Sequence, residues 1–354
     1  MMKKYSKIKI CITVILCILF VGIVSMIIKN QFNAYYEQLN ETDQHILNEF
    51  NEYCKYTGEK DIWDDFCLGE KTILVMDGSF GKGYLINPAK EINSVFAKKI
   101  QMPSDYEITV YRIAPLAPQL LQFIFEGNFN SIDKEYSVYD NQVYFTKYND
   151  TASISTPFTS EHFMTFLSHE AFHYYMQNDW ADGSTYLMDE VSDEDLDLLY
   201  QEYEVLDKIQ KALMENVSEQ KLYFQYAEEY VNIVEKRLKK NFRYVKQELE
   251  RETIEGTATY AGIKASEIVG YDYGVMYFDN VKNVPFSEIA PNVKADNYKK
   301  AKLADRIPYE SGSLLCLFMD ELKVPNWQKR LNEQTRNSQM TIYSLIKEYM
   351  QERQ

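Results

Sequence analysis

Basic residues are scarce in this chain: 38 Lys and Arg stand against 53 Asp and Glu in 354 residues, which gives a formal net charge of −15. A nucleic-acid-binding face needs Lys and Arg in excess, so this composition argues against a nucleic acid as partner. Cysteine is also rare. Five residues without a CxxC pair exclude a disulfide scaffold and a thiolate zinc site. The sequence also lacks repeats, low-complexity stretches and Gly/Ser-rich linkers.

Apolar and aromatic residues, in contrast, are plentiful. They include 29 Tyr and 19 Phe, and the apolar share is 45%. This share is ample for a packed core, so a wholly disordered chain is excluded. A length of 354 residues allows one large domain or two small ones.

An uncharged, apolar run covers residues 10–28 and follows four lysines. As a helix it is long enough to span a bilayer, and the lysines favour a cytoplasmic N-terminus over residues 1–9. We therefore expect a single-pass signal anchor in the cell membrane, with the rest of the chain outside the cytoplasm. A cleaved signal peptide, which would give a secreted form, has the same flanks and is the alternative.

The patterns after this run change twice along the chain. Apolar residues at helical spacing predict a stalk or helical cover over 29–70. Residues 71–150 are β-rich with glycine-containing turns, whereas 159–354 reads as almost entirely helical. Strands followed by helices predict an α+β fold rather than an alternating α/β fold.

Two features of the exported part are left open by the sequence. Apolar steps of three and four over 190–250 predict an antiparallel helical hairpin, whose length leaves room for a partner surface. Cys54 and Cys67 flank a polar loop in a region where a disulfide is possible, and the sequence does not decide whether it forms.

Two of the four histidines of the chain occur in one H-E-x-x-H motif at 169–173. On a helix, His169 and His173 leave the same face, so their imidazoles can share one Zn²⁺ ion at about 2.0–2.1 Å. Glu170 is placed to take a proton from a water that the ion activates. His45 and His162 have no motif around them and are interpreted as structural.

A catalytic zinc site needs a third protein ligand. The segment 251–262 offers Glu252 and Glu255, three residues apart on one helical face. The glutamate that does not bind the ion would orient an imidazole. The same segment is rich in glycine and alanine, which would let it pack closely on the helix that carries the histidines.

These motifs together resemble the gluzincin zinc metallopeptidases, especially the aminopeptidase N-like catalytic domain. The matching blocks follow one another in the family's order: H-E-x-x-H at 169–173, E-G-x-A at 255–258 and Y-E-x-G at 309–312. The resemblance implies a thermolysin-like domain over 71–354 with one catalytic zinc. It also implies that Glu255, rather than Glu252, is the third ligand and that Tyr309 stabilises the oxyanion.

The chain departs from this family in two respects. Positions 174–254 separate the second histidine from Glu255, far more than is usual, and the predicted hairpin accounts for the excess. The Gly-x-Met-Glu-Asn motif that binds the substrate amine in the aminopeptidases does not precede His169. A Met-Glu-Asn sequence at 214–216 lies after the zinc motif and lacks the glycine, so exopeptidase specificity is unsupported.

The sequence thus predicts a membrane-anchored, extracytoplasmic zinc metallopeptidase, a hydrolase of peptide bonds with Glu170 as general base. Peptide or protein substrates would pair with a strand near 142–148 by strand addition. One alternative is a catalytically inactive gluzincin-like ectodomain that binds or senses a partner. Another is an assembly or adhesion ectodomain in which zinc is structural. The presence of Glu170 argues against both, because a structural zinc site closes its fourth position and needs no base.

Overall fold

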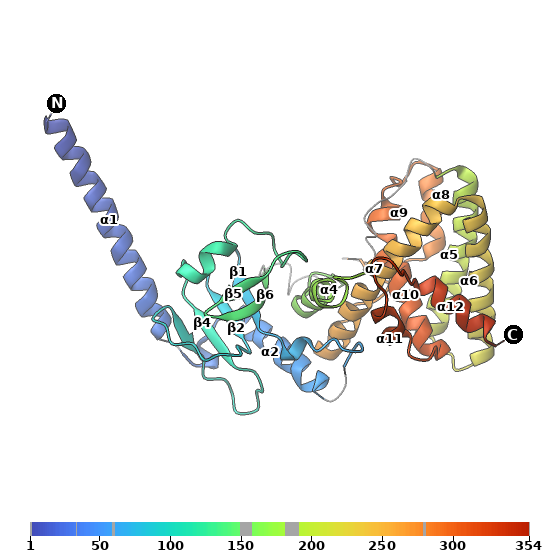
Figure 1. Ribbon diagram of the computed structural model, residues 1–354, viewed down its shortest axis with the longest axis horizontal. Helices are drawn as coiled ribbons and strands as arrows, with labels where there is room; N and C mark the ends of the chain where they lie inside the picture. The colour runs from blue at the N-terminus through green and yellow to red at the C-terminus, as the bar shows by residue number, and fades with distance from the viewer. Residues whose placement is uncertain are drawn as a thin grey trace. The chain divides into compact units, whose positions relative to one another are not determined.

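The structure is a computed structural model that describes residues 2–32, 34–58, 61–148, 158–180, 191–278 and 281–353. Helices and one sheet occur together, which confirms the predicted α+β class (Figure 1). The chain forms two compact units. A sheet unit comprises 1–59 and 67–153, and a helical unit comprises 60–66 and 154–354.

Helix α1 extends from Met2 to Gln31. Its segment Ile12–Gln31 is long and apolar enough to cross a membrane or to act as a signal sequence, and it is the one such helix among the described residues. The helix continues beyond the predicted 10–28 span because Asn30 and Gln31, although polar, find hydrogen-bond partners in the sheet unit.

Six strands form one sheet in the order β3-β4-β2-β1-β6-β5. The strands are β1 (Ile73–Asp77), β2 (Gly83–Ile86), β3 (Ala97–Lys99), β4 (Val110–Ile113), β5 (Tyr136–Val138) and β6 (Asn141–Tyr148). The central pair β1–β6 is parallel, whereas the other described pairs are antiparallel. Both faces are covered, so β1 reads as a continuous apolar run with four buried residues, as expected of a strand buried on both sides.

The predicted stalk over 29–70 is divided between the two units. Helix α2 (Glu41–Thr57) belongs to the sheet unit, where its Asp43 accepts hydrogen bonds from the hydroxyls of Tyr84 and Tyr148, both at 2.7 Å. Residues 61–66 belong to the helical unit. The region therefore acts as a cover, and the stalk interpretation is not retained. Cys54 and Cys67 are not joined by a disulfide.

Strand β6 does not offer the edge that the sequence suggested for an added peptide. Along 144–148 it pairs with β1 on one side. On its other side Asn128 and Asn130 exchange backbone hydrogen bonds with Lys147 and Phe145. Since both edges are used there, the expectation of strand addition at 142–148 is wrong, because local β-propensity does not reveal which edges are occupied.

The helical unit contains nine α-helices among its described residues. They are α4 (Phe163–Met176), α5 (Asp193–Met214), α6 (Gln220–Lys240), α7 (Phe242–Val269), α8 (Ile289–Lys294), α9 (Lys302–Asp305), α10 (Ile307–Leu322), α11 (Trp327–Asn332) and α12 (Ile342–Gln351). Helices α4, α7 and α10 carry the three motif blocks, and α7 packs against both of the others.

Helices α5 and α6 form the predicted antiparallel hairpin. Ion pairs link Lys208 to Glu229 and Arg237 to Glu202. The later residue of α5 pairs with the earlier residue of α6, so the two helices run antiparallel. The second arm is shorter than predicted. It ends at Asn241, whose side chain accepts a hydrogen bond from the backbone of Tyr244 and starts α7. Residues 242–250 thus belong to α7, the helix that carries Glu255, and 181–190 lie outside the described residues.

Glycines set how closely α7 approaches its two neighbours. A Cβ atom on Gly256 would lie 2.3 Å from the Cα atom of Gly312 on α10, and one on Gly262 would lie 3.0 Å from the carbonyl oxygen of Thr165 on α4. The small residues predicted to let α7 pack closely on the histidine helix therefore serve two contacts. Gly262 faces α4. Gly256 faces α10, the helix that carries Tyr309, so Glu255 and Tyr309 lie on closely packed helices.

Candidate metal centre

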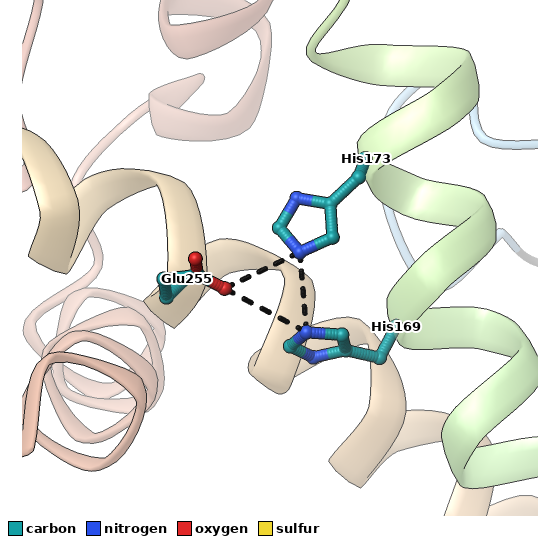
Figure 2. Close-up of side chains that lie close together, drawn as sticks. All are labelled: His169, His173 and Glu255. Atoms are coloured by element: carbon teal, nitrogen blue, oxygen red, sulfur yellow. Dashed lines mark hydrogen bonds and ion pairs between the residues drawn. The ribbon is translucent and has the colours of Figure 1, made fainter. Parts of the chain in front are cut away.

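Three side chains from two helices converge on one point. The Nε2 atoms of His169 and His173 are 3.1 Å apart, and the Oε2 atom of Glu255 lies 3.8 Å and 3.3 Å from them, respectively. Figure 2 shows both imidazoles leaving α4 toward the carboxylate on α7. Among the described residues this is the one group of three or more His, Cys, Asp or Glu side chains that could hold a metal ion.

The spacing of these atoms fits zinc. Tetrahedral ligands at about 2.0–2.1 Å from an ion are about 3.3 Å from one another. The three observed distances, 3.1, 3.3 and 3.8 Å, lie around that value. Two imidazoles and one carboxylate are also the donor set of catalytic zinc sites, which leave a further position open for water or substrate.

Each imidazole is oriented by a partner on its other ring nitrogen. The Nδ1 atom of His173 lies 2.6 Å from the side-chain oxygen of Gln177, whose amide in turn donates to the carbonyl oxygen of Ile254 at 2.8 Å. The Nδ1 atom of His169 lies 3.4 Å from the hydroxyl of Thr259 on α7. Such contacts select the tautomer that presents Nε2 to a metal ion.

Arg251 holds the carboxylate of Glu255 from the opposite side. Its Nη2 atom lies 3.0 Å from Oε1, so Oε2 is the oxygen that faces the histidines. The same Nη2 atom lies 3.4 Å from the hydroxyl of Tyr309. Sequence reasoning missed this role, although an Arg four residues before a Glu on a helix is a recognisable ion-pair spacing.

The charges at His169 and Glu255 suit metal binding. Burial, helped by the charge of His173, lowers the pKa of His169 to about 3, so its imidazole is neutral. Burial alone would raise the pKa of Glu255, but His173, His169 and Arg251 outweigh it and lower that pKa to about 2. A neutral imidazole and an ionised carboxylate are the forms that coordinate a metal ion. Burial opposes protonation of His173, but the hydrogen bond and charge of Glu255 raise its pKa, so a metal ion would displace a proton there.

Glu170 is adjacent to the first histidine and does not belong to the ligand cluster. Burial, reinforced by the charge of Glu255 and opposed by His173, raises the pKa of its carboxyl group to about 7. A carboxylate with a pKa near the operating pH can both accept and return a proton, which is the requirement for general acid–base chemistry.

Tyr309, at the start of α10, lies over the metal ligands. Its ring stacks on that of His169, with centroids 5.7 Å apart and planes 6° apart. Burial, together with the negative charge of Glu255, raises the pKa of its phenol. The hydroxyl therefore keeps its proton and is available as a hydrogen-bond donor beside the cluster.

Glu252, the other candidate ligand, lies outside the cluster. It is buried, and its Oε2 atom is 3.4 Å from the hydroxyl of Tyr230 on α6. The remaining histidines are also elsewhere. His45 pairs with Glu49 on α2, and His162 stacks on Tyr271 at 3.6 Å between ring centroids. These contacts agree with the structural interpretation of both histidines.

Comparison of the chain with protein-family models, with curated proteins and with solved structures finds no match. The arguments about its chemistry therefore depend on the geometry of its own side chains.

Proposed function

We propose that this chain is a membrane-anchored zinc metallopeptidase with a gluzincin-like, thermolysin-like catalytic domain outside the cytoplasm. The observation that carries the proposal is the convergence of His169, His173 and Glu255 at zinc-ligand spacing, with a half-buried glutamate, Glu170, directly after the first histidine. Binding of a metal alone would not require that glutamate.

Different groups of the site would carry out different steps of peptide-bond hydrolysis. Zn²⁺, when bound, supplies a Lewis acid that polarises the scissile carbonyl and lowers the pKa of a water molecule toward about 7. Glu170 accepts a proton from the attacking water on its carboxylate and passes it to the departing amine. The Tyr309 hydroxyl donates a hydrogen bond to the oxyanion that develops on the carbonyl oxygen.

The end of α1 supports an anchor that is retained rather than a signal peptide that is removed. Asn30 is buried, and its side-chain amide donates to the carbonyl oxygens of Phe96 and Arg112 in the sheet unit. Cleavage after this residue would remove a bonded part of the fold. Four lysines before the apolar segment favour the cytoplasmic side for the N-terminus.

The test separates metal binding from catalysis with single substitutions. Glu170→Gln keeps the size of the side chain but cannot accept a proton. It should retain about one zinc per chain while cleavage of a mixed peptide library falls by about 10²–10⁴-fold. Glu255→Ala should lose zinc and cleavage together, since it removes a ligand.

Two outcomes would count against the proposal. A wild-type protein that binds zinc tightly and cleaves no peptide would favour the alternative, an inactive binding or sensing ectodomain. Zinc retained in Glu255→Ala and lost in Glu252→Ala would show that the third ligand is misassigned. A reporter fused after Gln354 checks the topology, because it should be active only outside the cytoplasm.

A further inference from the structure

We infer that the sheet unit lies against the membrane surface through exposed apolar side chains at the end of α1. The side chains concerned, here called the lipid-facing cluster, are Phe32, Val95, Leu116, Leu121 and Phe125. The inference depends on the proposed membrane anchor, and it adds a second, peripheral contact of the same chain with the bilayer.

The C-terminal end of α1 is bonded directly to the sheet. The side-chain amide of Asn30 donates to the carbonyl oxygens of Phe96, at 3.1 Å, and of Arg112, at 3.2 Å. In return, the guanidinium of Arg112 donates to the carbonyl oxygens of Asn30, at 2.9 Å, and of Phe32, at 2.7 Å. Bonds in both directions fix the helix end to β4 and to the residue before β3.

The last residue of the apolar segment already contacts β3. The segment long enough to cross a membrane ends at Gln31, whose side-chain amide donates to the carbonyl oxygens of Val95, at 2.9 Å, and Ala97, at 3.3 Å. No length of chain therefore separates the span from the sheet. When α1 lies in a bilayer, the residues around this junction are held at the lipid–water boundary.

Three apolar side chains around the junction are exposed: Phe32 by 64%, Val95 by 63% and Leu116 by 41%. Phe32 directly follows α1. The carbonyl oxygen of Val95 accepts a hydrogen bond from Gln31, the last residue of α1. The carbonyl oxygen of Phe96 accepts from Asn30 of α1 and also from the backbone amide of Ala114. Leu116 follows Ala114 by two residues. The three residues thus lie in the segments that meet at the end of α1.

The exposed apolar character continues along the chain from Leu116. Leu121 lies on the short helix η3 (Pro118–Phe123), and Phe125 follows with 95% of its surface exposed. Contiguous exposed apolar residues mark interaction sites. The bilayer is the occupant that the structure favours, because the cluster starts where α1 leaves the span. Insertion of apolar side chains at the headgroup boundary also needs no basic patch, which suits a chain with a net charge of −15.

Photo-crosslinking in the full-length protein tests this contact. The chain is reconstituted in phosphatidylcholine nanodiscs with p-benzoylphenylalanine in place of Phe125 or Val95. Tyr56, an exposed aromatic at the end of α2, is the control, because α2 lies on the side of the sheet unit away from α1 (Figure 1). Irradiation at 125 and 95 should give protein–lipid adducts, detected by mass, about tenfold or more above those at position 56.

Two results would overturn the inference, and they are distinguishable. Equal lipid adducts at 125, 95 and 56, in a protein that resists alkaline extraction, would contradict the bilayer contact of the lipid-facing cluster but not the membrane anchor. Release of the full chain from the membrane by alkaline carbonate would contradict the proposed anchor itself. Adducts at 125 to a second protein chain instead of lipid would also contradict a bilayer contact.

Discussion

The guanidinium of Arg251 binds one oxygen of Glu255 at 3.0 Å and thereby turns the other oxygen toward the two metal-site histidines. Because Arg251 and Glu255 are four residues apart on α7, this pair is formed within one helix and does not depend on a loop. It also carries Arg251 to within 3.4 Å of the Tyr309 hydroxyl. One cation thus restrains both the proposed third ligand and the proposed oxyanion donor.

Loss of Arg251 should weaken zinc binding, because Glu255 is then free to rotate. Arg251→Met is expected to raise the zinc dissociation constant by about 10–100-fold, as for other partners of metal ligands. Arg251→Lys should give an intermediate value. Competition with a chromophoric chelator measures the affinity. The direction of the change in zinc affinity is informative, since removal of a positive charge alone would strengthen cation binding. Arg243→Met, an exposed charge on the same helix, is the control.

Removal of the Tyr309 hydroxyl should separate catalysis from metal content. Tyr309→Phe keeps the ring that stacks on His169 but loses the donor, so peptide cleavage should fall by about 10²–10³-fold with zinc retained. Tyr200→Phe makes the same chemical change at an exposed position on α5 and should leave the rate unchanged. Equal rates for Tyr309→Phe and wild type would exclude the hydroxyl from the reaction.

The buried carboxyl group of Glu252 should make the stability of the metal-free protein depend on pH. Burial, with the charge of Glu202 next in size, raises the pKa of Glu252 from 4.5 to about 8. Between these values the folded chain keeps a proton that the unfolded chain has lost. The free energy of unfolding should therefore fall as the pH rises from about 5 to 8.

Glu252→Gln should flatten this dependence, because the amide stays neutral in both states. Urea unfolding at several pH values in the presence of a chelator measures it, with Glu228→Gln on the exposed face of α6 as the control. Parallel curves for wild type and Glu252→Gln would show that this carboxyl group is ionised in the folded protein.

A single methyl group should disturb the crossing of α7 and α10. The Cβ atom of Gly256→Ala would meet the Gly312 backbone at 2.3 Å, and that of Gly312→Ala would meet the Glu252 carbonyl oxygen at 2.1 Å. Backbone atoms cannot yield as side chains do, so each variant should lose about 1–3 kcal/mol of unfolding free energy or more. Gly127→Ala, which meets no atom within 4 Å, is the control in denaturant titrations. A Gly256→Ala variant as stable as that control would mean that the helices separate at little cost.

Local periodicity was sufficient to place the ligand candidates. His169 and His173 share a face of one helix, and this depends only on their spacing. The α+β class also followed from the order of the segments. The role of Gln177 was not predictable, because it depends on which side chain a rotamer meets after folding. The pairing of Arg251 with Glu255 was foreseeable from their spacing of four residues, but its contact with Tyr309 was not. Glu255 and Glu252, equivalent by spacing, are distinguished in the structure only by the helices packed against α7.

Long-range pairing explains the other differences. Residues near 29–70 have the helical pattern of a stalk, but the Asp43 carboxylate binds hydroxyls from β2 and β6, which no local pattern encodes. The edges of β6 were assigned wrongly for the same reason. The hairpin ended early because the cap at Asn241 interrupts an apolar periodicity that continues across the break.

The turn of the hairpin offers a place to label the protein. Residues 215–219 join α5 to α6, and Asn216 there adopts a φ of 50° in an exposed bend. All contacts of the metal centre described above come from α4, α7 and α10. Lengthening a surface loop costs little conformational entropy. An affinity tag or a fluorophore-binding peptide inserted at this turn would make the protein purifiable and visible in cells while both ends of the chain stay native.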